Sequence, residues 1–128
     1  MHLRFVTKTI HAYLDYPVAL SLLAMPFILG IGVENPWARW ISVATGVAAL
    51  VLTIFTDHAT GLIRVVPYWL HLAVDRLVGI VFIVVPFAFG FHGLDAWYYW
   101  ANAIAVLLVT TALNAPEPKG EVSDLARA

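Results

Sequence analysis

The decisive stretch of this chain is residues 67–91, PYWLHLAVDRLVGIVFIVVPFAFGF, an apolar run that only His71, Asp75 and Arg76 interrupt. An α-helix rises about 1.5 Å per residue, so roughly 20 apolar residues cross the hydrocarbon core of a bilayer. The strands of a membrane barrel alternate apolar and polar residues, whereas this run is apolar on every side. The stretch therefore predicts a transmembrane helix.

Three further apolar runs lie outward from this one. The first covers residues 11–33, the next covers residues 37–55 after a break at Asn35 and Pro36, and the last covers residues 96–113. Short connections within each pair of runs force antiparallel hairpins. We therefore expect an all-α fold, an integral membrane four-helix bundle with spans near 11–33, 37–55, 67–91 and 96–113.

The composition favours lipid as the solvent. Of the 128 residues, 62% are hydrophobic and 12% are charged, whereas a soluble domain carries about a quarter charged residues. The net charge of −1 gives no electrostatic footprint for nucleic acid. The absence of cysteine excludes disulfides and thiolate metal sites. The length and composition predict one membrane domain whose first partner is the lipid bilayer.

The second half of the chain repeats the first when the sequence is shifted by 60 residues without a gap. Chance similarity between membrane helices would pair only apolar residues, but here histidine meets histidine and tryptophan meets tryptophan. The aligned pairs include Arg4 and Arg64, His11 and His71, Asp15 and Asp75, Pro26 and Pro86, Gly30 and Gly90, Trp37 and Trp97, and Trp40 and Trp100. Residues 1–60 and 61–114 each hold two spans, which predicts parallel repeats about an axis along the membrane normal.

Each repeat has a proline–aromatic motif in its first span and a tryptophan near the start of its second. In these features the chain resembles the SPW-repeat membrane proteins over nearly all of residues 4–114. That family has Ser-Pro-Trp where this chain has Met25-Pro26-Phe27 and Val85-Pro86-Phe87, so only the proline is retained. The resemblance implies a small multi-span bacterial membrane protein, and it implies no particular activity.

Lysine and arginine residues gather on one side of the predicted bundle, and Arg39 alone lies near the other side. Because positive residues favour the cytoplasmic side, we expect both termini and the 56–66 connection to be cytoplasmic. Together with the resemblance, this places the protein in a bacterial inner membrane. The tail of residues 115–128 combines proline, glycine and mixed charge, which predicts a flexible cytoplasmic segment.

The candidate binding residues are two histidine–aspartate pairs. His11 and Asp15, like His71 and Asp75, are four positions apart, which puts both side chains on one helix face. Ionisable groups are costly inside a bilayer, so they are expected to face the bundle interior and to find partners there. If the first and third helices meet at the axis, all four side chains converge.

Three interpretations of these pairs remain open at this point. They form a polar clasp in which Arg76 supplies a compensating charge, since polar contacts hold membrane helices together. Alternatively, they handle a proton or a cation, as intramembrane ionisable groups often do. In the third interpretation, His11 and His71 ligate a metal or a haem. The spacing names no cofactor and does not choose among them.

The remaining prolines, aromatic residues and cations are expected to bend the helices or to anchor their ends at the lipid interface. Pro26 and Pro86 each remove an amide donor within a span and free the carbonyls of Leu22 and Phe82, which predicts helix kinks. Aromatic rings and cations at the ends of spans typically lie at the lipid interface. This set comprises Trp37, Trp40, Trp97, Trp100, Arg4 and Arg64. Asp57 and His58 are expected to face water.

The sequence contains no nucleophile elbow, phosphate loop or HExxH motif, so an enzyme is not expected. The first functional hypothesis is a structural or accessory role, either self-associating as a homo-oligomer or as a subunit of a larger membrane complex. The alternative is an ion-, proton- or metal/haem-binding membrane protein that uses the paired residues of the first and third spans.

Overall fold

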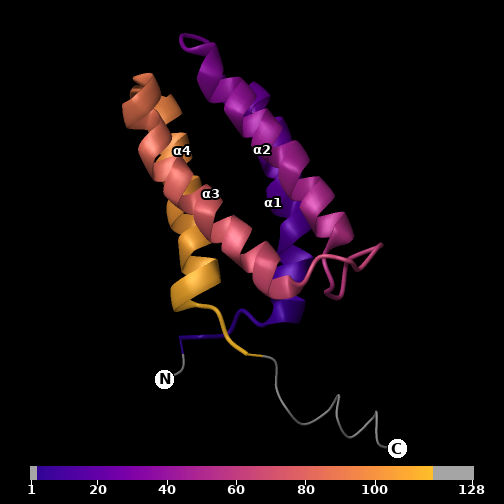
Figure 1. Cartoon of the computed structure of the whole chain (residues 1–128). Coiled ribbons are helices and arrows are strands. Elements are labelled where there is room, and N and C mark those ends of the chain that lie inside the picture. Colours follow the sequence, from indigo (N-terminus) through magenta and orange to yellow (C-terminus); the bar gives the residue numbers. More distant parts are fainter. Residues whose placement is uncertain (1–2, 117–128) are drawn as a thin grey trace, which may run out of the picture.

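The computed structural model describes residues 3–116 of the chain, and within that range it is all-helical with no strand. The helices are α1 (Lys8–Ile28), α2 (Pro36–Phe55), α3 (Tyr68–Phe89) and α4 (Gly93–Leu107), and a π-helix, η1 (Leu108–Ala112), continues α4 (Figure 1). The all-α prediction is confirmed. The predicted flexible tail lies, from residue 117 onward, outside the described range.

Local sequence explains where these helices begin and end. The Thr7 side chain accepts a hydrogen bond from the amide of Ile10, and the Asn35 side chain caps α2 with Pro36 at its first turn. The predicted first span extends to residue 33, but α1 ends at Ile28 because Gly30 adopts a φ of +69°. Left-handed backbone of this kind closes helix ends and is readily adopted by glycine.

Both prolines named from the sequence lie in the last turn of their helices. Their carbonyls accept the amides that close those ends, Ile31 to Pro26 and Phe91 to Pro86, each at 2.8 Å. The carbonyl of Leu22, which Pro26 leaves without its helical donor, accepts the Ser42 hydroxyl at 2.9 Å. A side chain of α2 therefore satisfies a backbone group that proline frees in α1.

The four helices pair as two hairpins, since α1 packs along α2 and α3 packs along α4, with fewer contacts between the hairpins. Small residues allow the close approach within each hairpin. A Cβ added at Gly46 would lie 3.1 Å from the carbonyl oxygen of Ala19, and one at Gly79 would lie 2.7 Å from the side chain of Leu107. Glycine thus lies on α2 in the first hairpin and on α3 in the second.

Gly46→Leu is expected to destabilise the protein, because its side chain would push α1 and α2 apart at this crossing. Overpacking of this kind costs about 1–3 kcal/mol of the free energy of unfolding. Thermal unfolding in detergent measures the loss. The control is Ala44→Leu on an exposed face of the same helix, and an equal melting temperature for the two variants would contradict the prediction.

The two hairpins are joined at one end by backbone hydrogen bonds. The amide of Val6 donates to Leu113 (2.9 Å) and its carbonyl accepts from Ala115 (2.9 Å), while the amide of Val66 donates to Phe55 (2.8 Å) and its carbonyl accepts from Asp57 (2.8 Å). Residues 3–7, 56–67 and 113–116 therefore lie together at the lower end of the bundle in Figure 1, and the connections 29–35 and 90–92 lie at the other end.

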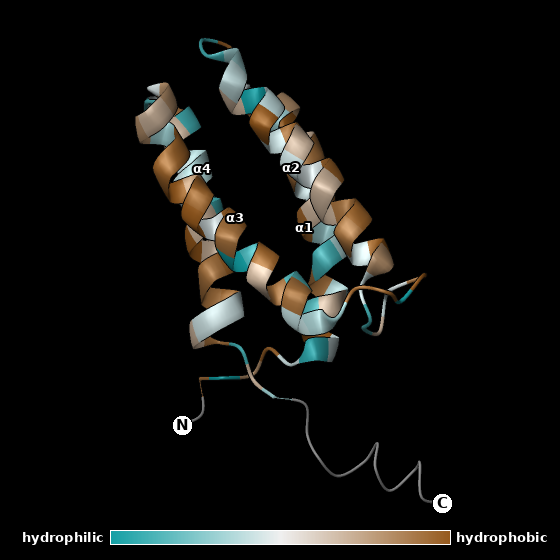
Figure 2. Ribbon diagram, in the orientation of Figure 1, coloured by the Kyte–Doolittle hydropathy of each residue, from teal (hydrophilic) through white to brown (hydrophobic). Residues whose placement is uncertain are grey.

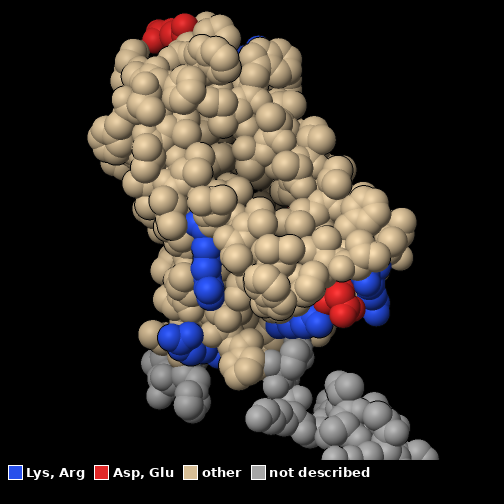
Figure 3. All heavy atoms as spheres, viewed as in Figure 1, with Lys and Arg blue, Asp and Glu red and all other residues tan. Residues whose placement is uncertain are grey.

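Many large apolar side chains of this protein are exposed, although others such as Ile31 and Phe82 lie in its core. Small or polar residues, among them Ala12, Ala19, His11, His71 and Ser42, are buried, with exposed fractions of 0–2%. Large apolar side chains such as Leu20, Phe27, Ile80 and Phe87 are more than half exposed. Apolar residues, coloured brown, predominate along the helices in Figure 2. Figure 3 shows the acidic and basic residues of this face mainly towards the two ends of the molecule, with a largely uncharged surface between them.

By length and composition, α2 and α3 could each cross a membrane. Only 22% of the most apolar stretch of α2 and 28% of that of α3 are buried inside the protein. The other two helices do not meet the same criteria, since α1 carries His11 and Asp15 and α4 has 15 residues before η1 begins.

Candidate functional site

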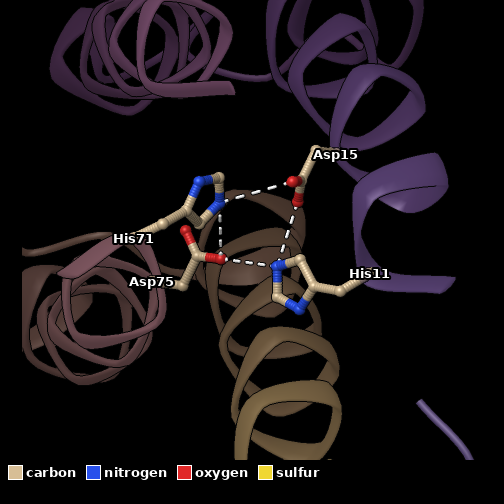
Figure 4. Close-up of side chains that lie close together, drawn as sticks. All are labelled: His11, Asp15, His71 and Asp75. Atoms are coloured by element: carbon tan, nitrogen blue, oxygen red, sulfur yellow. Dashed lines mark hydrogen bonds and ion pairs between the residues drawn. The ribbon is translucent and has the colours of Figure 1, made fainter. Parts of the chain in front are cut away.

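Four side chains from α1 and α3 meet between the hairpins, near the end of the bundle that carries residues 56–67. They are His11 and Asp15 of α1 and His71 and Asp75 of α3, and Figure 4 shows all four pointing towards one another. One ligand atom from each lies within 4.8 Å of the ligand atoms of the others. We call these four residues the His/Asp cluster.

The contacts in the cluster run both along and between the helices. Within a helix, His11 Nε2 lies 3.0 Å from Asp15 Oδ1 and His71 Nε2 lies 3.2 Å from Asp75 Oδ2. Between helices, His11 Nε2 lies 2.9 Å from Asp75 Oδ2 and His71 Nε2 lies 3.4 Å from Asp15 Oδ2. Each histidine therefore presents the same nitrogen to both carboxylates, and the cluster joins the two hairpins.

His58 also contacts the cluster, which corrects the prediction that it faces water. Its side chain is fully buried, and its Nε2 donates to Asp15 Oδ2 at 2.9 Å. The 56–66 connection is folded against α1, because the Tyr16 hydroxyl donates to the carbonyl of Thr60 and the Thr60 hydroxyl donates to the carbonyl of Ala12, each at 2.8 Å. Asp57, by contrast, is exposed as predicted.

A threonine fixes the orientation of His71. The Thr56 hydroxyl donates its single proton to the carbonyl of Leu52 at 2.5 Å, so it can only accept from His71 Nδ1, which lies 2.7 Å away. His71 Nδ1 is therefore protonated. In a neutral imidazole this leaves the lone pair on Nε2, the nitrogen that faces the two carboxylates.

His11 has no equivalent support. Among residues 3–116, its Nδ1 is buried without a hydrogen-bond partner. Its ring is instead held edge-on against the rings of Tyr68 and His71, with centroid separations of 5.7 and 5.4 Å. Both histidines of the cluster thus direct Nε2 towards the carboxylates, but different contacts hold the two rings in place.

Arg76 does not supply the charge expected of it in the polar clasp. Its Nε and Nη2 both donate to the carbonyl of Thr110, at 3.1 and 2.6 Å, and no ion pair joins it to Asp75 within the described part of the chain. Adjacent positions on a helix point in different directions, so Asp75 can face the cluster while Arg76 faces α4 and η1.

The cations expected at the lipid interface bind backbone carbonyls near the same end of the bundle. Arg4 donates to the carbonyls of Thr111 and Asn114, at 3.1 and 3.2 Å, and so caps the end of η1. Arg64 donates within its own loop to Gly61 and Ala59, at 3.2 and 3.3 Å. Both side chains remain exposed, and their contact with lipid stays a prediction.

The four tryptophans lie in the N-terminal halves of α2 and α4, towards the end of the bundle opposite the cluster. Trp37, Trp40 and Trp97 are more than half exposed, while Trp100 donates its indole N–H to the carbonyl of Ile83 at 3.2 Å. This is the placement expected for an aromatic belt. None of them contributes to the cluster.

A second polar contact between the hairpins lies away from the cluster and was not anticipated from the sequence. The Tyr98 hydroxyl donates to Ser42 Oγ at 2.6 Å, because the Ser42 proton is already given to Leu22. The hydroxyl of Tyr99, which is fully buried, donates to the carbonyl of Ala38, also at 2.6 Å. These contacts attach α4 to α2 at the end of the bundle opposite the cluster.

The cluster borders a cavity of about 200 Å³. All four of its side chains line this space, and apolar residues such as Leu14 and Val109 complete the walls. Imidazole nitrogens and carboxylate oxygens are ligands of divalent transition metals, and they also bind protons. The arrangement can therefore hold a small cation beside apolar walls.

No protein-family model matches the chain, and neither a curated protein nor a solved structure shows significant similarity to it. The resemblance to the SPW-repeat proteins accordingly stays a prediction, and the function must be inferred from the geometry of the cluster.

Proposed function

We propose that the chain is an integral membrane protein whose four helices all span the bilayer as two parallel repeats, with both termini in the cytoplasm. The large exposed apolar side chains and the concentration of charge towards the two ends support this arrangement. Lipid is the solvent in which such a surface is stable. The cluster then lies about one helical turn inside the cytoplasmic border, and the tryptophans lie at the opposite interface.

The function that we propose within this membrane protein is the binding of one divalent transition metal ion, with Zn²⁺ as the first to test. A single observation carries the proposal: two imidazole nitrogens and two carboxylates, from helices in different hairpins, converge within 4.8 Å. A tetrahedral zinc site with bonds of about 2.0–2.2 Å separates its ligand atoms by roughly 3.2–3.6 Å. The cross-helix distances of 2.9 and 3.4 Å are close to that spacing.

Charge balance supports a cation at this place. If His71 is neutral, its Nε2 lone pair faces carboxylate oxygens of Asp15 and Asp75, and all of these atoms repel one another. A divalent ion would neutralise both carboxylates and accept both imidazole lone pairs. Protons on the Nε2 atoms of both histidines would also balance the two carboxylates, and they occupy the same lone pairs that a metal would use. Protons and metal therefore compete, and metal affinity is expected to fall in acid.

The geometry favours a metal ion over a haem. In a bis-histidine haem the porphyrin plane lies between the two imidazoles. Here the rings of His11 and His71 have centroids 5.4 Å apart, and the carboxylates of Asp15 and Asp75 contact both Nε2 atoms. A porphyrin would have to displace both carboxylates.

The test is a metal titration of the whole chain in lipid nanodiscs after treatment with a chelator. We expect Zn²⁺ to bind with one ion per chain, to release protons, and to raise the melting temperature. At a free concentration 100 times the Kd, bound metal stabilises a protein by about 2.7 kcal/mol. Fe²⁺ and Mn²⁺ serve as comparison ions. A melting temperature that no divalent ion changes would refute the proposal.

Thr56→Val is expected to weaken zinc binding by about 10–100-fold, the usual effect of removing the group that orients a metal-ligating histidine. The substitution deletes the acceptor for His71 Nδ1 while conserving side-chain shape. The control is Thr111→Val, because the Thr111 hydroxyl also donates back to its own helix but meets no histidine. Equal Kd values for the two variants would show that Thr56 does not position the ligand.

A second candidate function is the structural or accessory role, with the chain associating with itself or with other membrane subunits. The observation that favours it is that the cluster joins the hairpins through contacts requiring no metal. Native mass spectrometry of the purified complex separates the two functions. Under the accessory role, the double substitution of Asp15 and Asp75 by asparagine changes the subunit composition, and no metal is present in the unaltered protein.

A further inference from the structure

A larger cavity of about 540 Å³ lies beside the His/Asp cluster, between the two hairpins. Its walls come from all four helices and are almost entirely apolar, with Leu22, Leu52, Val78 and Phe82 among the lining residues. A volume of about 300–1,000 Å³ is typical of sites for small molecules. Many of the lining side chains are aliphatic, which suits a flexible hydrocarbon body.

The larger cavity adjoins the smaller cavity beside the cluster. Five residues line both: Val18, Ala49, Asp75, Asn102 and Val106. Asp75 is also the most exposed member of the cluster, since 18% of its side chain is accessible against 9% for Asp15 and 2–3% for the histidines. A molecule in the cavity would therefore meet the cluster at the Asp75 carboxylate.

The polar groups of the cavity define the head group that it can accept. They are Asp75, Thr45 and Asn102, and no lysine or arginine of the described residues lines the space. The Thr45 hydroxyl gives its only proton to the carbonyl of Ile41, so its oxygen can only accept a hydrogen bond. The Asn102 amide gives one N–H to the carbonyl of Tyr98 and retains its second N–H and its oxygen. An anionic head would be buried beside a carboxylate with no cation among the lining residues, which is costly.

We infer that this cavity binds a neutral, lipid-soluble molecule whose hydrocarbon body occupies the apolar space and whose hydroxyl or carbonyl oxygen lies at Asp75. The oxygen would add as a fifth ligand to the metal that the cluster holds, and this part of the inference rests on the proposed function. A long-chain alcohol and a lipid-soluble quinone share this chemistry. A fatty acid is excluded, because its head would place a second carboxylate beside Asp75.

The experiment uses the whole chain in nanodiscs and a decanol analogue that carries a diazirine on its alkyl chain. After irradiation, mass spectrometry is expected to find the label on cavity-lining residues such as Val51, Val74 and Val78. Excess decanol and a decyl-substituted benzoquinone should each compete, and decanoate should not. The competitor that acts at the lower concentration identifies the alcohol or the quinone as the better ligand.

A pair of variants ties the labelling to the cavity. Ala48 lines the larger cavity but not the smaller one, so Ala48→Phe should reduce labelling about tenfold by steric exclusion and leave metal affinity unchanged. Ala101→Phe, on an exposed face of α4, is the matched control and should label like the unaltered chain. Label spread evenly over lipid-facing residues, or competition by decanoate equal to that by decanol, would overturn the inference.

Co²⁺ in place of Zn²⁺ tests the position of the oxygen, because the visible absorption of bound Co²⁺ responds to its ligands. Decanol is expected to shift this spectrum, and decane, which fills the same space without an oxygen, is not. A chain that binds no Co²⁺ or Zn²⁺ but is labelled in the cavity refutes the proposed metal function and supports the cavity. A chain that binds metal but is not labelled in the cavity supports the proposed metal function and refutes the cavity inference.

Discussion

His71→Ala is expected to weaken zinc binding by more than about 100-fold. Loss of a residue that only orients a metal ligand costs up to about 100-fold, and loss of the ligand itself should cost more. The substitution removes one of only two imidazole ligands, and it also leaves the Thr56 hydroxyl without its partner. Isothermal titration of the protein in nanodiscs gives the Kd, and the stabilisation by zinc seen in thermal unfolding should disappear with it.

His92→Ala is the matched control, since His92 is exposed before α4 and its side chain makes no capping hydrogen bond. Its zinc affinity should equal that of the unaltered chain. His11→Ala should behave like His71→Ala, because both histidines contribute the same kind of ligand atom. A His71→Ala variant that keeps its zinc affinity would remove the cluster from consideration as a metal site.

Asp15→Ala is expected to destabilise the metal-free protein by about 3–5 kcal/mol, the usual result of removing one partner from a buried ionic contact. Asp15 contacts three histidines, His11 at 3.0 Å, His58 at 2.9 Å and His71 at 3.4 Å. Its loss therefore detaches α1 from α3 and from the 56–66 connection at once. Thermal unfolding in detergent with excess chelator measures the effect without a contribution from metal.

Asp75→Ala should be less damaging than Asp15→Ala, because within residues 3–116 Asp75 forms ion pairs only with His11 and His71, and it is more exposed. Asp57→Ala is the control for loss of a carboxylate near the same end, since Asp57 is exposed. If Asp15→Ala melted at the temperature of Asp57→Ala, the cluster would carry no stabilising energy between the hairpins, and the clasp interpretation would fail.

The helices and the paired residues of the cluster could be predicted because they depend on short-range patterns. Apolar runs of sufficient length define the helices, and a spacing of four places histidine and aspartate on one face. The early end of α1 depends on Gly30, whose positive φ is one of several conformations open to glycine. The sequence shows such a residue but does not decide which conformation it takes.

The contribution of His58 could not be predicted, because it depends on tertiary folding of a connection. Thr60 and Tyr16 fasten that connection to α1, and only then does His58 reach Asp15. The repeat gives no help here, since the position 60 residues later is Pro118, not a histidine. The role predicted for Arg76 was wrong for a different reason. Arg76 is next to Asp75 in the sequence, but adjacent residues on a helix do not share a face.

The backbone pairing of Val6 has a consequence for the order in which the chain can mature. Val6 leaves the ribosome before α1, yet its two hydrogen-bonding partners, Leu113 and Ala115, follow η1. By contrast, Phe55 and Asp57 are synthesised shortly before their own partner, Val66. The first hairpin can therefore dock its outgoing connection during translation, while its amino-terminal segment has to wait, unpaired, until the second hairpin is complete.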